Sequence, residues 1–138
     1  MQIALPAELD TLPQSEAGVT FPLFHPATLE PVQMDGIPLT VTVKGSDSEA
    51  WALAGLEIER RNRKKSAAGE KIDSIADLCE QLAAVTIAWS GFRTLDKKEA
   101  QCTKEQVAAV YRAAPAIRDQ VYVRVTRREN FIKDSPNA

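Results

Sequence analysis

One helical pattern, over residues 70–92, constrains the fold of this chain more than any other feature. Apolar and small residues recur there at spacings of three and four, which places them on one face of an α-helix. The members of this face are Ile72, Ile75, Cys79, Leu82, Thr86 and Trp89. Further apolar residues widen the face, so we expect other elements to cover the helix on more than one side. Gly91 can adopt the left-handed conformation that ends a helix. The pattern predicts a core helix over 70–90, in which Trp89 is a packing residue.

Residues 19–44 have the pattern of a small antiparallel sheet. Apolar and polar residues alternate near its end with a period of two, which is typical of a strand with one buried face. The apolar members are Leu39, Val41 and Val43. The dipeptide at 35–36, Asp-Gly, readily supplies the two positive φ angles of a tight hairpin turn. Residues 19–24 are β-prone, but Pro22 restricts them to an edge strand or an extended segment.

A helix on each side of the central one is predicted from its capping residues. Ser46 and Glu49 have the spacing of a capping box at the start of a helix over 47–65. Thr103 and Gln106 have the same spacing before a helix over 104–114.

The last segment, over 116–131, has two readings. Valines at 121, 123 and 125 alternate as in a strand, whereas the apolar and charged residues also separate onto two faces of a helix. We predict a helix, because Pro115 is well placed as its first residue.

Together these patterns predict an α+β fold, mainly α, with a small N-terminal antiparallel sheet over 19–44. Four helices follow, over 47–65, 70–90, 104–114 and 116–131. We expect a single globular domain over 19–132, preceded by an irregular arm over 1–18 and followed by a polar tail over 133–138. If the arm packs at all, its leucines are the contacts: Leu5, Leu9 and Leu12.

The composition argues for a binding protein rather than an enzyme. The chain has 138 residues, 44% hydrophobic and 26% charged, which is ordinary for a globular domain. Its net charge of −2 argues against nucleic acid as a general partner, and no apolar run is long enough to span a membrane. Residues 1–10 lack the features of a signal peptide. Cys79 and Cys102 lack metal-ligand spacing, so we expect free thiols in a reducing cytoplasm.

No group of residues in the sequence converges on a catalytic, cofactor or metal site. His25 is the only histidine, and the proline that follows it favours a structural role in a turn. There is no glycine-rich phosphate loop. Three carboxylates in the central helix are expected to face solvent: Asp73, Asp77 and Glu80. We therefore predict no catalytic residues, no cofactor and no bound metal.

A basic run ends the first predicted helix and is the candidate partner-binding site. It consists of Arg60, Arg61, Arg63, Lys64 and Lys65. One interpretation is that these cations only stabilise the negative end of the helix dipole. The other is that they contact an acidic partner, either another copy of the chain or another protein. A DNA-binding role is the weakest reading, because no aromatic residues are interleaved with the run.

The order of features along the chain resembles that of the tail assembly chaperones of long-tailed bacteriophages and their prophage relatives. The resemblance covers residues 21–131. The stretches that carry it are 21–26 (FPLFHP), 35–41 (DGIPLTV), 45–48 (GSDS), the basic end at 60–65, 89–92 (WSGF), 103–107 (TKEQV), Pro115 and 130–131 (NF).

The resemblance implies a protein that acts in the cytoplasm of the bacterial host and is not part of the mature virion. Such chaperones bind and solubilise the tape-measure protein, recruit subunits of the major tail tube protein, and tend to self-associate. Because a tape-measure protein is long and helix-prone, its chaperone needs shallow apolar grooves between helices. We expect such edges on the first helix, at Trp51, Leu53 and Leu56, and on the last, at Ile117 and Val121. The alternative is a small virion protein, such as a tail-completion or head–tail connector protein.

Overall fold

A three-stranded antiparallel sheet organises the chain, and it is drawn from segments far apart in sequence. The computed structural model describes residues 3–132. Its sheet has the order β1-β4-β5, where β1 is Val19–Pro22, β4 is Thr40–Val43 and β5 is Thr86–Ser90. Val19 pairs with Val43, and Val41 pairs in turn with Trp89. A separate two-stranded hairpin joins β2 (Gln33–Met34) to β3 (Ile37–Pro38). The predicted mixed α+β fold, mainly α, is confirmed.

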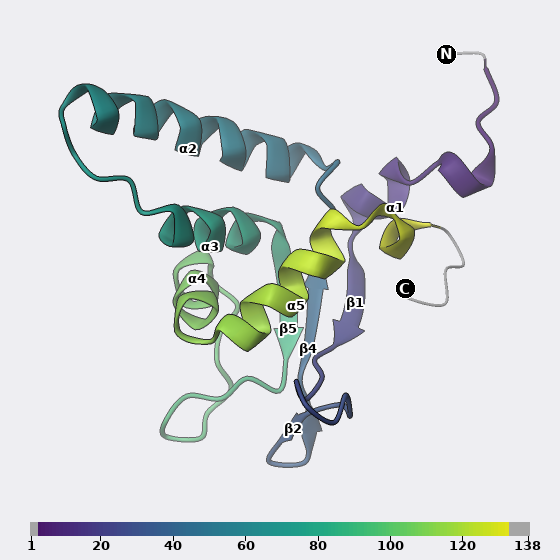
Figure 1. Cartoon of the computed structure of the whole chain (residues 1–138). Helices are drawn as coiled ribbons and strands as arrows, with labels where there is room; N and C mark the ends of the chain where they lie inside the picture. The colour runs from purple at the N-terminus through teal and green to yellow at the C-terminus, as the bar shows by residue number, and fades with distance from the viewer. Residues whose placement is uncertain (1–2, 133–138) are drawn as a thin grey trace.

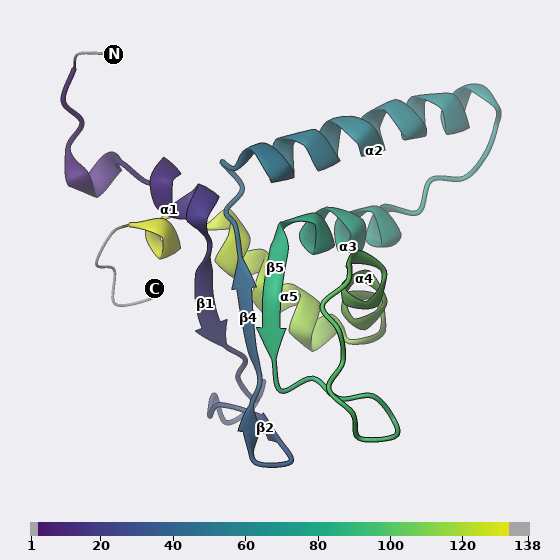
Figure 2. The same ribbon diagram turned by 180° about the vertical axis from the view of Figure 1, so that it is seen from behind.

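The helices lie on one face of this sheet and beyond its β5 edge (Figure 1). They are α2 (Glu49–Ala67), α3 (Ser74–Val85), α4 (Lys104–Ala113) and α5 (Pro115–Thr126), and a short 3₁₀ turn, η2, covers Arg128–Phe131. The core forms where α5, α3 and α4 meet the sheet. Its fully buried members include Val41, Val43, Leu82, Val85, Tyr111, Val121 and Val125. Within the described residues, no helix crosses the opposite face of the sheet (Figure 2).

The prediction of one helix over 70–90 is wrong at both ends. The helix covers only Ser74–Val85, and the next five residues form β5. Thr86, Ile87 and Trp89 are β-branched or aromatic and suit a strand as well as a helix. Thr86 and Trp89 pair with β4, which satisfies backbone groups in a sheet, and Ile87 lies at a bulge in this pairing. Gly91 has a positive φ of +87°, but it follows β5 and therefore ends a strand rather than a helix. Ile72 and Ile75, predicted on the buried face, are 44% and 51% exposed.

The hairpin turn and one helix cap were predicted correctly. Asp35 and Gly36 have φ angles of +53° and +78°, the two positive values that the Asp-Gly pair predicted. The Thr103 side chain accepts a hydrogen bond from the backbone amide of Gln106. The segment after Pro115 is helical, as predicted, although the α-helix ends at Thr126 and the extended residue Arg127 separates it from η2.

The cap of α2 was predicted at the wrong serine. Ser48, not Ser46, occupies the cap position, and its hydroxyl accepts from the amide of Trp51 at 3.3 Å. The same hydroxyl donates to the carbonyl oxygen of Gly45 at 2.6 Å. This second bond fixes the turn between β4 and α2, which explains why the helix begins two residues later than the capping-box spacing suggested.

The N-terminal segment is more ordered than an irregular arm. Ala7–Leu9 forms a 3₁₀ turn, η1, and Leu12–Ala17 forms a short helix, α1, that packs against η2. Its anchor is Ser15, which is 1% exposed, whereas the leucines proposed as contacts lie at the surface: Leu5 (54%), Leu9 (77%) and Leu12 (52%). The Ser15 carbonyl accepts a hydrogen bond from the amide of Gly45, which joins α1 to the end of β4. The predicted polar tail over 133–138 lies outside the described residues.

Candidate protein-binding site

Helix α2 lies along the outer edge of the molecule and packs against α3 through one of its faces (Figure 1). Ile58, on the face toward α3, is 8% exposed. Leu56, on the opposite face, is 61% exposed, and Leu53, which also borders the space between α2 and α3, is 56% exposed. The helix therefore has an inner face held by the fold and an outer face that no other described element covers.

Polar side chains hold α2 against α3. The guanidinium of Arg61 donates to Asp77 Oδ1 at 2.8 Å and to Glu80 Oε1 at 3.0 Å. Glu80 and Asp77 together raise the pKa of Arg61 above its usual value. Asn62 donates to the second oxygen of Asp77 at 2.9 Å, and Gln81 donates to the carbonyl oxygen of Trp51 at 3.1 Å. The prediction that Asp77 and Glu80 only face solvent is therefore wrong.

Close approach of the two helices depends on small residues. A Cβ atom placed on Gly55 would lie 2.9 Å from Nε2 of Gln81, so a larger residue there would displace the glutamine. Alanines occupy the neighbouring positions, Ala54 on α2 and Ala83 on α3. They leave space between the helices instead of filling it.

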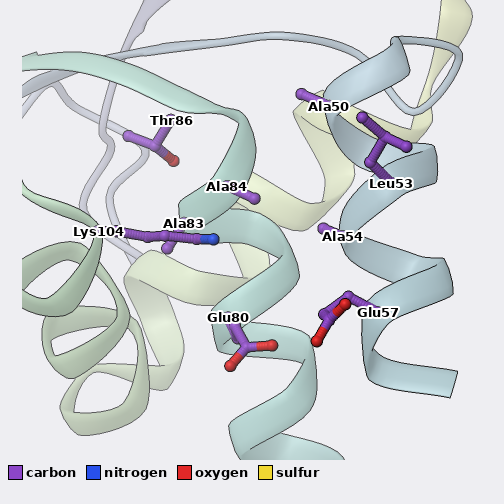
Figure 3. Close-up of a pocket in the computed structure, with 9 residues that line it drawn as sticks. All are labelled: Ala50, Leu53, Ala54, Glu57, Glu80, Ala83, Ala84, Thr86 and Lys104. Carbon is purple, nitrogen blue, oxygen red and sulfur yellow. The ribbon is translucent and has the colours of Figure 1, made fainter. Parts of the chain in front are cut away.

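That space is the α2–α3 groove, with a volume of about 490 Å³ (Figure 3). Its lining residues are Ala50, Leu53, Ala54, Glu57, Glu80, Ala83, Ala84, Thr86 and Lys104. Alanines from both helices line its apolar part, and Lys104 of α4 also lines the groove. The carboxylates of Glu57 and Glu80 lie together at one end. The groove thus combines a small apolar surface of alanines with three charged side chains, an arrangement suited to holding an amphipathic segment.

The structure divides the predicted basic run between the two faces of α2. Arg61 points toward α3, where it forms ion pairs with Asp77 and Glu80. Arg60 pairs with Glu57 and Arg63 pairs with Glu59, and both pairs are on the exposed side of the helix. Lys64 is exposed and Lys65 is half-buried. Arg60, Arg63 and Lys64 are therefore the members of the run that a partner could reach.

The residues predicted to form apolar binding edges also differ in their exposure. Leu53 and Leu56 are exposed, as a binding edge requires, and Trp51 is half-buried. On the last helix, Val121 is fully buried in the core, so the prediction that it forms an edge is wrong.

Sequence reasoning missed Lys104 and the alanines of the groove. In the sequence, the only signal for the alanines is the recurrence of small residues in the two helices.

The remaining candidate residues have structural roles. Nδ1 of His25 accepts hydrogen bonds from the amides of Ala27 and Thr28, which stabilises the turn there. Cys79 is buried and Cys102 is half-buried, and both are free thiols. Among residues 3–132, no cluster of three or more histidine, cysteine or acidic side chains could hold a metal ion.

Comparisons with known proteins found no relative of this chain. No protein-family model, no curated protein sequence and no solved structure matches this chain. In the part of the chain that the structure describes, no helix has both the length and the apolar character to cross a membrane. The fold and the surfaces around α2 are therefore the basis for a proposal about function.

Proposed function

We propose that this chain is a phage tail assembly chaperone that binds and solubilises the tape-measure protein and recruits tail-tube subunits during tail assembly. It acts in the bacterial cytoplasm and leaves before the virion is complete. The proposal starts from the resemblance over residues 21–131. The structural observation that supports it is the α2–α3 groove, an open depression between two helices that alanines and charged side chains line.

The groove has the right chemistry for a helical segment of a long, helix-prone partner. Side chains that project from one helix pack into depressions on another, and the alanines of α2 and α3 leave such a depression. Leucines or methionines of a tape-measure helix would fill the space over Ala54, Ala83 and Ala84. Lys104 would pair with an acidic residue of that helix, and the exposed Glu57 with a basic one.

The proposal predicts a tape-measure gene beside the gene for this chain, and co-expression of the two genes tests it. We expect the tape-measure protein to move from the pellet to the soluble fraction and to copurify with the chain. Ala84→Arg places a large side chain in the groove and should return the tape-measure protein to the pellet. Ala109→Arg is the matched control, because Ala109 is exposed on α4, away from the groove.

Two results would count against the proposal. The first is a tape-measure protein that stays insoluble with the wild-type chain. The second is an Ala84→Arg variant that solubilises it as well as Ala109→Arg does, which would exclude the groove. Mass spectrometry of purified virions addresses the alternative role, because a virion protein would be present there in stoichiometric amounts and an assembly chaperone would not.

A further inference from the structure

Strand β1 is an edge of the sheet with backbone groups that point away from it. The strand order β1-β4-β5 leaves only one side of β1 paired (Figure 2). Pro22 has no N–H to give to β4, and the Leu23 N–H donates to the Leu39 carbonyl oxygen at 3.0 Å. Since residues of an antiparallel ladder direct their backbone groups to alternate sides, Thr20 and Pro22 direct theirs away from β4. Within residues 3–132, no group bonds to the Thr20 N–H or to the carbonyl oxygens of Thr20 and Pro22.

Phe24, the next residue that points outward, shows what chemistry such an edge requires. Gln120 of α5 accepts a hydrogen bond from the Phe24 N–H at 2.9 Å and donates one to the Phe24 carbonyl oxygen at 2.8 Å. These are the two bonds that a neighbouring strand makes to one residue. The side-chain amide of Gln120 thus takes the place of a peptide group at Phe24. Thr20 and Pro22 have no such cover among the described residues.

A pocket adjoins this uncovered part of β1 on the side toward α5, and it is called the β1–α5 pocket below. Its volume is about 300 Å³, and its apolar lining comes from Phe21, Pro22, Phe24 and Val123. The guanidinium of Arg124 lies over the ring of Phe21, 5.0 Å from its centroid. Because neighbouring strands direct paired side chains to the same face, a residue placed opposite Phe21 on an added strand would point into this pocket.

We propose that β1 accepts an extended segment of another protein as a fourth, antiparallel strand, with one apolar side chain in the β1–α5 pocket. Three consecutive residues of that segment make the contact. The first donates its N–H to the Pro22 carbonyl oxygen, the second fills the pocket opposite Phe21, and the third exchanges two hydrogen bonds with Thr20. In this mode of recognition the backbone bonds provide affinity and the pocket selects the side chain.

The pocket also distinguishes such a segment from a second copy of β1. Outward residues pair with outward residues, so the residue of a second copy opposite Phe21 would itself belong to the inward set. Val19 and Phe21 of that copy are 7% and 2% exposed, because both side chains lie in their own core. Neither can enter the pocket of a partner. The occupant must therefore carry an apolar side chain that is outside a folded core, as an extended segment does.

The contact is short and should be weak. Pro22 offers no donor and Gln120 covers Phe24, two features that protect an edge strand from indiscriminate pairing. They leave a window of three hydrogen bonds and one side chain. A dissociation constant in the millimolar range is expected for an isolated peptide. Binding should change little with salt, because no ion pair is part of it.

Titration of the isotope-labelled full chain with a peptide, followed by NMR, tests the proposal. The probe is acetyl-Thr-Thr-Leu-Thr-Thr-amide, and we expect the Thr20 amide signal to move downfield as it gains a hydrogen bond. Replacing the leucine of the probe by aspartate should raise the dissociation constant by about tenfold or more. Methylating the backbone nitrogen of the threonine after the leucine should do the same, because that N–H donates to the Thr20 carbonyl oxygen. Methylating the leucine nitrogen is the matched control and should have little effect, since that N–H faces away from β1.

Two variants of the chain locate the pocket. Val123→Glu places a charge in the lining and should weaken binding by about tenfold, whereas Tyr122→Glu should bind like the wild-type chain. The two side chains are similarly exposed on α5, at 40% and 42%, so the comparison is matched. The two methylated probes need no variant and decide the matter if Val123→Glu does not fold.

Three results would overturn the proposal. The first is a Thr20 amide signal that the probe does not move at millimolar concentration. The second is equal binding of the two methylated probes, or equal binding by Val123→Glu and Tyr122→Glu. The third is a Thr20 amide signal that moves with the concentration of the chain alone, which would mean that a second copy covers the edge. The tape-measure protein is absent from this experiment, so its outcome is independent of the chaperone role.

Discussion

The hydroxyl groups of Thr86 and Tyr111 lie 2.7 Å apart in the interior, at the point where α3 passes into β5. Thr86 Oγ1 also donates to the carbonyl oxygen of Leu82 at 2.9 Å. Since threonine has one hydroxyl hydrogen, Tyr111 must be the donor in the first bond. Burial raises the pKa of Tyr111 well above its usual value, which keeps the phenol neutral and able to donate. The pair joins α4 to the junction between helix and strand.

Removing either hydroxyl should destabilise the fold, but by different amounts. Thr86→Val leaves the buried Tyr111 hydroxyl without a partner and should cost about 1–3 kcal/mol in the free energy of unfolding. Tyr111→Phe leaves Thr86 bonded to Leu82 and should cost about 1 kcal/mol. The double variant should lose less than the sum, because no unpaired phenol remains. Urea unfolding of the four proteins measures this, and additive losses would show that the two hydroxyls do not interact.

The region around Thr86 is also where the sequence pattern alone fails to predict the fold. Thr86 and Trp89 fit the helical spacing of 70–90 and equally fit a strand, so local periodicity cannot separate the two. The deciding contact is with β4, more than 40 residues earlier in the chain. Two features that depend on neighbours in sequence were predicted correctly, the Asp35-Gly36 turn and the Thr103 cap, whereas the cap of α2 was predicted two residues too early.

The cap of α2 allows two serines to be compared directly. Ser48→Ala removes the acceptor for the Trp51 amide and the donor to the Gly45 carbonyl, and should lower the free energy of unfolding by about 1–2 kcal/mol. Ser46→Ala is the control, since Ser46 is not the cap, and should change it by less than about 0.5 kcal/mol. Thermal melts of both variants decide the matter. A larger effect from Ser46→Ala would place the cap where the capping-box spacing first suggested.

The basic run shows how far the candidate site could be predicted. Its presence at the end of a helix is plain in the sequence, but its division into inner and outer residues depends on where α3 packs. The side chain of Asp77 is only 13% exposed, so Arg61→Ala leaves a partly buried carboxylate with one charged partner fewer. We expect a loss of about 1 kcal/mol in the free energy of unfolding, between the values for exposed and buried pairs.

Arg63→Ala is the matched control for Arg61→Ala, because its partner Glu59 is well exposed. It should change the free energy of unfolding by less than about 0.5 kcal/mol. Chemical denaturation of the two variants compares them under the same conditions. Equal losses would mean that Arg61 does not hold α2 to α3. In the expected case, charge reversal at Arg61 tests folding, whereas reversal at Arg63 tests binding.

Asp73 gives the fold a measurable dependence on acid. Its carboxylate accepts from Arg112 Nη1 of α4 at 2.9 Å and also caps α3 by accepting from the amide of Ala76 at 3.0 Å. The hydrogen bond from Arg112, with that from Ala76, lowers the pKa of Asp73 to about 2. A carboxyl group whose pKa is lower in the folded state than in the unfolded state stabilises the fold above its unfolded pKa of about 3.9. That contribution is lost as the pH falls through the folded pKa.

Asp73→Asn should therefore lower the melting temperature at pH 6 and have a smaller effect at each step below pH 4. Asparagine keeps a cap acceptor and removes the charge, so the change isolates the ion pair with Arg112. Thermal melts of the wild-type and Asp73→Asn proteins between pH 6 and pH 2.5 measure the difference. In an Arg112→Ala background the same substitution should have a smaller pH dependence, since mainly the hydrogen bond from the Ala76 amide then lowers the pKa of Asp73. A difference in melting temperature that stays constant from pH 6 to pH 2.5 would show that Asp73 and Arg112 are not coupled in the folded protein.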